Sequence, residues 1–298
     1  MNPAINAVHL ALSVSRLHIV AIAALGCFTF GWAFTGSYPW LLSMVCALDW
    51  FLVNLLNRVV DQKEDQANAI TGADFAGRHR RGIMVLGFSL LGGSFMGVHL
   101  LAPALTPLRL AYHLLGLAYN WRLLPGGRRI KELYFWKNTA SATGFMITVF
   151  GYPLIQAAST GAGLLPDVTA ATIAICGIFF FFFELSYEVI YDLRDAPGDR
   201  LAGVRTYPVV HGERGAVRIV DALIVSSMLV LLTGYLMGAV PWRIFIMIFA
   251  PASQLGLYKL FLRRGITSAH CVGLTWLGAT LLFIYHVWVM LDLPGARM

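Results

Sequence analysis

Long apolar runs leave this chain few ways to fold. We count about nine stretches of roughly 20 residues, long enough to cross the ~30 Å hydrocarbon core of a bilayer. Hydrophobic residues make up 58% of the chain and charged residues 12%, about half the charged share of a soluble domain. Because a spanning segment must pair its own backbone groups, the spans are expected to be helices. The sequence therefore predicts an all-α polytopic membrane protein, one bundle and one domain over residues 1–298, with spans near 17–35, 38–60, 83–102, 108–124, 136–157, 168–193, 216–238, 242–262 and 269–291.

The basic residues are concentrated on one side of these spans. Of the 22 Lys and Arg residues, all except Arg109, Arg243 and Arg297 fall near the N-terminus or in and beside every second loop. By the positive-inside rule this side faces the cytoplasm, which puts the N-terminus inside and the C-terminus outside. In a bacterium this would be the inner membrane. The net charge of +7 is thus explained by topology, and no nucleic-acid partner is expected.

A first polar row lies where the second span reaches the cytoplasmic side. In "LLNRVVDQKEDQ" (55–66), Asn57, Asp61 and Asp65 follow one another at four-residue intervals. Residues at this interval share one face of a helix. If the helix continues, these side chains form one stripe, with Asp49 two turns earlier on nearly the same side.

A second row lies where the sixth span reaches the same side, in "FELSYEVIYDLRDAPGDR" (183–200). Its acids recur at helical spacing, and they are Glu188, Asp192, Asp195 and Asp199. We expect the stripe to hold until Pro197 and Gly198 interrupt the helix. Glu184 extends it one turn deeper. Two helices far apart in sequence therefore bring acids to the same membrane depth.

Clustered carboxylates need a cation, because each Asp placed inside a membrane costs roughly 2.5–3.5 kcal/mol. Carboxylate and amide oxygens without His or Cys favour Mg²⁺ over zinc. Mg²⁺ is commonly shared between carboxylates and substrate phosphates. Basic residues near both rows complete the layering expected around a diphosphate, and they are Arg122, Arg128, Arg129, Lys131, Arg194, Arg200 and Arg205.

These motifs resemble those of the UbiA superfamily of intramembrane prenyltransferases. The pattern Asn57-xxx-Asp61-xxx-Asp65 is similar to the first Asp-rich motif of that family, and "DLRDAPGDRLAGVRTYPVVHG" (192–212) is similar to the second. The number of spans and the place of the motifs match as well, so the resemblance covers essentially the whole chain.

The chain also departs from the family pattern. Position 58 is Arg where the family usually has Asp, and the loop after the first motif has no Arg-Pro-Ile-like element. A Tyr-xxx-Lys element is replaced by Tyr119 followed at that offset by Leu123. These departures leave the acceptor subclass open.

The resemblance implies a Mg²⁺-dependent transfer of an isoprenoid chain from its diphosphate to a small acceptor, usually an electron-rich aromatic ring. The diphosphate leaves, an allylic cation develops, and the acceptor captures it. The implied catalytic acids are Asp61, Asp65, Asp192, Asp195 and Asp199, and the implied metal ligands are these five with Asn57 and Glu188. The implied substrate-binding residues are Asn57, Arg122, Arg128, Lys131, Tyr187, Glu188 and Arg194.

Further residues are weaker candidates. Aromatic side chains that either stabilise the cation or only pack are Tyr187, Tyr191, Phe145 and Phe150. Candidates for shaping the acceptor end are Asp49, Arg16 and His18. The alternative function is a UbiA-type terpene cyclase, in which the chain's own double bond captures the cation. A transporter is disfavoured because both acid rows lie at one surface rather than at the midplane. Prenyl chain length, acceptor identity and oligomeric state stay open.

Overall fold

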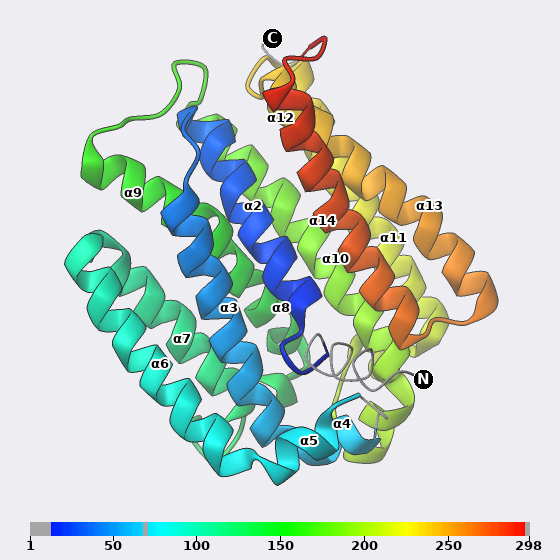
Figure 1. The fold of residues 1–298 in the computed structure, drawn as a ribbon. Helices are drawn as coiled ribbons and strands as arrows, with labels where there is room; N and C mark the ends of the chain where they lie inside the picture. Colours follow the sequence, from blue (N-terminus) through cyan, green and yellow to red (C-terminus); the bar gives the residue numbers. More distant parts are fainter. Residues whose placement is uncertain (1–12, 68–70, 296–298) are drawn as a thin grey trace, which may run out of the picture.

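The computed structural model describes residues 13–67 and 71–295, which form helices joined by short loops (Figure 1). No β-strand occurs in these two ranges. The prediction of an all-α polytopic membrane protein is confirmed. In chain order the helices are α2 (Leu17–Thr35), α3 (Trp40–Val60), α4 (Gln62–Ala67), α5 (Ala73–Arg78), α6 (Arg80–Leu101), η1 (Pro103–Leu105), α7 (Thr106–Asn120), η2 (Ile130–Glu132), α8 (Tyr134–Phe145), η3 (Met146–Gly151), α9 (Tyr152–Thr160), α10 (Ala170–Ala202), α11 (Tyr207–Leu236), α12 (Trp242–Phe245), η4 (Ile246–Ile248), α13 (Phe249–Arg264) and α14 (Ser268–Met290).

Seven helical segments of the described ranges are long and apolar enough to cross a membrane. They are α2, α3, α6, α10, α11, α14 and the run from α12 to α13. The other two predicted spans are also helical. One is α7, whose 15 residues extend about 22 Å, and the other is divided into α8, η3 and α9. The predicted number of about nine is therefore approximate.

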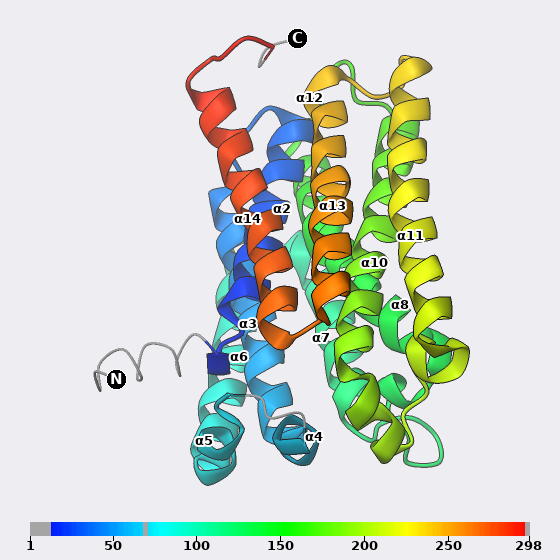
Figure 2. The same cartoon turned by 90° about the vertical axis from the view of Figure 1, so that its right-hand side faces the viewer.

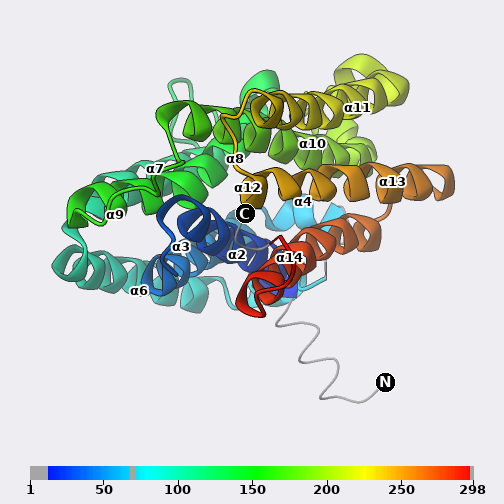
Figure 3. The same cartoon turned by 90° about the horizontal axis from the view of Figure 1, so that it is seen from above.

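The long helices run side by side (Figures 1 and 2). α2 packs against both α3 and α14, and α10 packs along α11. The C-terminal ends of α3 and α10 lie at the same end of the bundle, at the bottom of Figure 1. Seen from above, α4 lies beneath the middle of the bundle (Figure 3), where it contacts α10 as well as α3. The two acid-bearing segments therefore meet at one end of the protein.

The outer faces of several helices are apolar. α6 is the clearest case, since its exposed side chains include Val85, Leu86, Met96 and Leu100. In water so large an apolar surface would be unfavourable, whereas lipid chains can cover it. The inside of the bundle is filled by aromatic residues such as Phe30, Phe34 and Phe179.

A buried ion pair joins α3 to α7 inside the bundle. Arg109 is fully buried, and its Nε and Nη2 donate to the Asp49 carboxylate at 2.9 and 2.5 Å. Asp49 also accepts from the Tyr152 hydroxyl at 2.7 Å and lies 3.0 Å from His113 Nε2. The sequence suggested Asp49 for the acceptor end, but the structure turns this carboxylate toward Arg109. Arg109 lies within α7. Because a buried guanidinium needs a counter-ion, the Asp49 carboxylate pairs with Arg109.

α8, η3 and α9 form one continuous helical path. The backbone is right-handed helical at the two junctions, Phe145 and Gly151. η3 is a π turn of six residues, in which the hydrogen bonds reach one residue further than in an α-helix. Thr148 within the turn accepts a hydrogen bond from Trp50 Nε1 at 2.9 Å, which anchors the turn to α3.

Candidate active site

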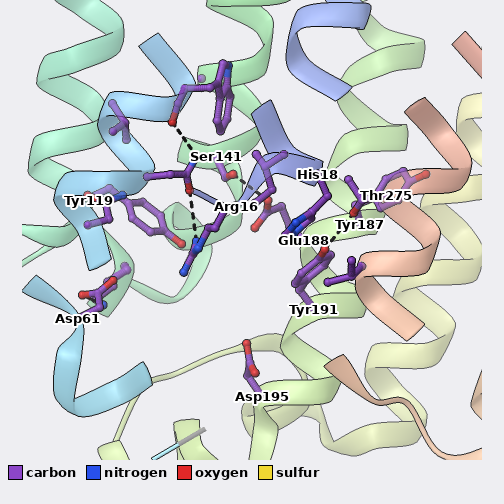
Figure 4. Close-up of a pocket in the computed structure, with 18 of the residues that line it drawn as sticks. Arg16, His18, Asp61, Tyr119, Ser141, Tyr187, Glu188, Tyr191, Asp195 and Thr275 are labelled. Atoms are coloured by element: carbon purple, nitrogen blue, oxygen red, sulfur yellow. Dashed lines mark hydrogen bonds and ion pairs between the residues drawn. The ribbon is translucent and has the colours of Figure 1, made fainter. Parts of the chain in front are cut away.

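A cavity of about 840 Å³ opens among α2, α3, α7, α8, α10 and α14. This volume is within the range of ligand pockets in proteins. Both acid rows line it, and so do Trp50 and Phe145, which lie about two turns further along α3 and α8 from Asn57 and Lys137. Figure 4 shows Asp61, Tyr119 and Glu188 converging on the cavity from separate segments. The cavity therefore combines a charged region with an apolar one.

The first row lines the cavity with all three of its members, Asn57, Asp61 and Asp65. α3 ends at Val60, so the expected single helix is interrupted at Asp61. The spacing survives because Asp61 N donates to Asn57 O and Asp65 N donates to Asp61 O, at 2.9 and 2.8 Å. The helical pattern of hydrogen bonds thus carries the stripe into α4.

Cations hold both carboxylates of the first row. Lys131 Nζ lies 2.6 Å from Asp61 Oδ1, and Arg58 Nη1 lies 2.7 Å from Asp65 Oδ2. All four side chains are buried, with exposed fractions between 5% and 11%. The Asn57 amide oxygen is buried without a hydrogen-bond partner among the described residues.

The second row also lines the cavity, through Asp192, Asp195 and Asp199. Lys137 Nζ donates to Asp192 at 2.7 Å and to Asp199 at 3.4 Å. Asp195 is held by its neighbour Arg194, through Nε at 2.7 Å and Nη2 at 2.5 Å.

The expected break at Pro197 and Gly198 is wrong, because α10 runs through both residues to Ala202. Pro197 removes one backbone donor near the end of the helix. A single Lys137 ammonium from α8 bridges Asp192 and Asp199, one on each side of the proline. The whole acid stripe therefore stays on one helix.

Deeper in the cavity the side chains are more mixed. Ser141 donates to Glu188 Oε1 at 2.7 Å. The Tyr187 hydroxyl donates to the Leu274 carbonyl at 3.2 Å, and the Tyr191 hydroxyl lies 2.9 Å from Thr275 Oγ1. Both tyrosines line the cavity and tie α10 to α14.

The loop between α7 and α8 is divided in its contacts with the site. Lys131 is buried and lines the cavity, whereas Arg122 and Arg128 are not among its described lining residues. Arg122 instead donates to the Gly127 carbonyl at 3.4 Å, and Arg128 is exposed. Burial alone would raise the pKa of the Glu132 carboxyl, but hydrogen bonds from Arg129 outweigh burial and hold this pKa below its usual value.

The weaker candidates from the sequence also divide into residues that line the cavity and one that does not. His18 lines the cavity from α2, Arg16 lines it from just before that helix, and Phe145 lines it from α8. Phe150 packs in the core instead, with its ring centroid 4.3 Å from that of Phe30.

Sequence reasoning did not single out Lys137 or Asn138, although both contact Asp192. Asn138 Nδ2 donates to Asp192 Oδ2 at 2.7 Å. Arg58 was noted only as a departure from the family motif. A signal was available, since a Lys-Asn pair at the start of an apolar span is costly unless it faces partners or a functional site.

The described residues contain no group of three or more His, Cys, Asp or Glu side chains placed to hold a metal ion. The carboxylates are instead neutralised by cations, chiefly Lys131 and Arg58 in the first row and Lys137 and Arg194 in the second.

The chain is similar to known proteins in sequence and in structure. A family model described as the UbiA prenyltransferase family matches residues 19–277. A digeranylgeranylglyceryl phosphate synthase of Natronomonas pharaonis is 29% identical over 99 residues, which are 33% of this chain and 33% of that protein. A synthase of the same name from Halobacterium salinarum is 35% identical over 86 residues, 29% of each chain. The matches thus span about a third of the length of these relatives or less.

A solved structure described as a UbiA homolog from Archaeoglobus fulgidus bound to GPP and Mg²⁺ has a similar fold. The TM-score is 0.69 at 14% sequence identity, and the match covers 93% of this chain and 98% of that one.

Proposed function

The chain belongs to the UbiA prenyltransferase family, and we propose that it transfers an isoprenoid chain from its diphosphate to a small acceptor in a Mg²⁺-dependent reaction. One observation carries this proposal. Two acid rows, from α3–α4 and from α10, line the charged part of a cavity whose other part is apolar. An isoprenoid diphosphate is divided in the same way, into an anionic head and an apolar chain.

The donor chemistry of these residues suits a hard divalent cation, although Lys and Arg side chains hold the carboxylates in this structure. Every acid of the two rows offers carboxylate oxygens, and the buried Asn57 amide oxygen has no partner among the described residues. Oxygen donors of this kind suit Mg²⁺. The residues that would hold it are Asn57, Asp61, Asp65, Glu188, Asp192, Asp195 and Asp199, and the bound ion supplies charge neutralisation to the departing diphosphate.

The basic side chains at the site are proposed to bind the diphosphate. Lys131, Lys137 and Arg194 each line the cavity and each already hold a carboxylate. Donating instead to phosphate oxygens would give charge-assisted hydrogen bonds to the leaving group. The bond between the allylic carbon and the diphosphate oxygen then breaks, and its electron pair leaves with the diphosphate.

The apolar part of the cavity is proposed to hold the prenyl chain. Trp50, Phe145 and Tyr187 line the cavity, and a cation near the face of an aromatic ring gains roughly 0.5–2 kcal/mol. The nucleophilic atom of the acceptor forms the new bond to the allylic carbon, and the proton that it loses passes to the released diphosphate. We expect an electron-rich aromatic ring as acceptor, in a site facing the cytoplasm.

The purified protein in detergent, supplied with an electron-rich aromatic acceptor and a prenyl diphosphate such as geranyl diphosphate, should release diphosphate when Mg²⁺ is present, and excess EDTA should abolish release. Asp192→Asn keeps the side-chain volume but removes a charge, so we expect kcat/KM to fall by at least about a hundredfold. The matched control is Asp74→Asn, since Asp74 is outside the cavity lining and its side chain accepts a hydrogen bond from Gln66. Full turnover in EDTA would overturn the proposal. Cyclic hydrocarbon formed without any acceptor would identify a terpene cyclase.

A further inference from the structure

Arg58 is a buried cation inside the first acid row, and the proposed reaction gives it no role. Its side chain is 5% exposed and lines the cavity. Arg58 lies three residues before Asp61 and seven before Asp65, so it shares the helical face that carries these acids. A row of oxygen ligands therefore contains a guanidinium at a place where another ligand would fit.

Two partners hold this guanidinium in place. Arg58 Nη1 donates to Asp65 Oδ2 at 2.7 Å, and Nη2 donates to the Ser13 carbonyl at 3.0 Å. Ser13 precedes α2, so Arg58 also ties that segment to the first row. Moving the side chain away would break a buried charge-assisted hydrogen bond and leave the Asp65 carboxylate without this partner. The guanidinium is therefore a fixed part of the row.

The charge of Arg58 equals that of a carboxylate together with a divalent ion. Many enzymes that act on phosphates clamp them between two such ions. A carboxylate that binds Mg²⁺ has one net positive charge, and a guanidinium supplies the same charge without an ion.

Arg58 also keeps one donor in reserve. Its Nε is buried and has no hydrogen-bond partner among the described residues. Buried donors are normally paired, and Arg58 lines the cavity that is proposed to hold the diphosphate. A phosphate oxygen would pair this donor, since the guanidinium group is well suited to phosphate.

We propose that Arg58 takes the place of a second divalent ion, so that the site binds the diphosphate with one Mg²⁺ and one fixed guanidinium. This inference rests on the proposed prenyl transfer and concerns its leaving group. Asp65 can keep Arg58 and still offer an oxygen to the ion, because a carboxylate has about four acceptor positions. Arg58 thereby joins the basic residues proposed to bind the diphosphate.

The test counts the metal ions bound to the full-length protein in detergent. Mn²⁺ replaces Mg²⁺, and electron paramagnetic resonance separates bound from free Mn²⁺. Geranyl S-thiolodiphosphate, which resists cleavage, is added in an amount equal to the protein, and a protein-free sample corrects for Mn²⁺ held by this analogue alone. Wild type should bind about one ion and Arg58→Asp about two, because an acid at this position completes a second oxygen site.

A charge reversal elsewhere provides the control. Arg81→Asp makes the same change at an exposed residue outside the cavity lining and should keep the wild-type count. Two ions on wild type, or an unchanged count in Arg58→Asp, would overturn the inference while the proposed function stands. No bound ion on wild type, or no turnover of geranyl diphosphate with Mg²⁺ and an aromatic acceptor, would count against the proposed function itself. Should Arg58→Asp not fold, Arg58→Asn is measured in its place with the same expected gain, since it frees Asp65 and adds an oxygen donor.

Discussion

Replacing Asp49 with Asn should destabilise the bundle more than any surface change. The substitution keeps the volume of the side chain but removes the counter-ion of Arg109, which is fully buried. Two hydrogen bonds from Arg109, at 2.9 and 2.5 Å, would lose their charged acceptor. Tyr152 and His113 also contact this carboxylate and would lose it.

The expected size of the effect follows from burial. Breaking a buried ion pair by removing one partner costs about 3–5 kcal/mol, because the other charge stays uncompensated. For a domain of this size class, 1 kcal/mol moves the melting temperature by about 2–4 °C. Asp49→Asn should therefore lower the apparent melting temperature in detergent by about 6–20 °C.

A second ion pair offers a matched control. Asp167 also receives two bonds from an arginine, Arg243, but its side chain is 51% exposed. The Arg243 side chain is only 10% exposed, but water reaches the Asp167 end of this pair, so Asp167→Asn should lower the melting temperature by less than Asp49→Asn does. The double variant Asp49→Asn/Arg109→Met removes the orphaned charge and should recover part of the loss. Equal melting temperatures for Asp49→Asn and Asp167→Asn would refute the reasoning.

Three further predictions follow from the site and the topology. Lys131→Ala should lower kcat/KM for the prenyl diphosphate by about tenfold to a hundredfold, since Lys131 is buried against Asp61. Arg128→Ala should leave it within about twofold in the same steady-state assay, because the Arg128 side chain is exposed; the reverse order would contradict the site. Single cysteines placed at positions 75 and 127 should be labelled by an impermeant maleimide from the cytoplasmic side only. One placed at position 162 should be labelled from outside only. Labelling of positions 75 and 162 from the same side would overturn the predicted topology. At low pH the ion pair between Asp167 and Arg243 should weaken, because hydrogen bonds from Arg243 hold the pKa of Asp167 below its usual value. The contribution of this pair to stability is present above the unfolded pKa of Asp167 and is lost as pH falls through the folded pKa. The melting temperatures of wild type and Asp167→Asn should therefore converge in acid.

The sequence contained enough to predict the class of fold and the meeting of the acid rows. Apolar length fixes helices in a bilayer, and the four-residue spacing survives local irregularity. The stripe from Asn57 to Asp65 persists through the end of α3 because backbone hydrogen bonds continue across Asp61. Periodicity reports which residues share a face, and this property tolerates a small bend.

Pairing between segments could not be predicted in the same way. Nothing near Lys137 in the sequence shows that its ammonium bridges Asp192 and Asp199. Arg109 was assigned only to the side opposite the basic loops, yet it reaches across to Asp49 inside the bundle. Arg128 and Lys131 are three residues apart, but only Lys131 turns inward. Such choices depend on which helices are neighbours, and that information is absent from a single periodic pattern.

The π turn at Met146–Gly151 makes one helix serve two polar sites in different rotational phases. Before the turn, Ser141 faces Glu188, and after it, Tyr152 faces Asp49. A π turn holds one residue more than the α-helical turn it replaces, so deleting one residue inside Met146–Gly151 would leave an ordinary α-helix in which Ser141 and Tyr152 keep nearly the same relative phase. Deleting a residue from the regular α-helix on either side would instead rotate one half against the other by about 100° and carry Tyr152 away from Asp49. The loss of one residue should therefore be tolerated far better inside the turn than elsewhere between Ser141 and Tyr152.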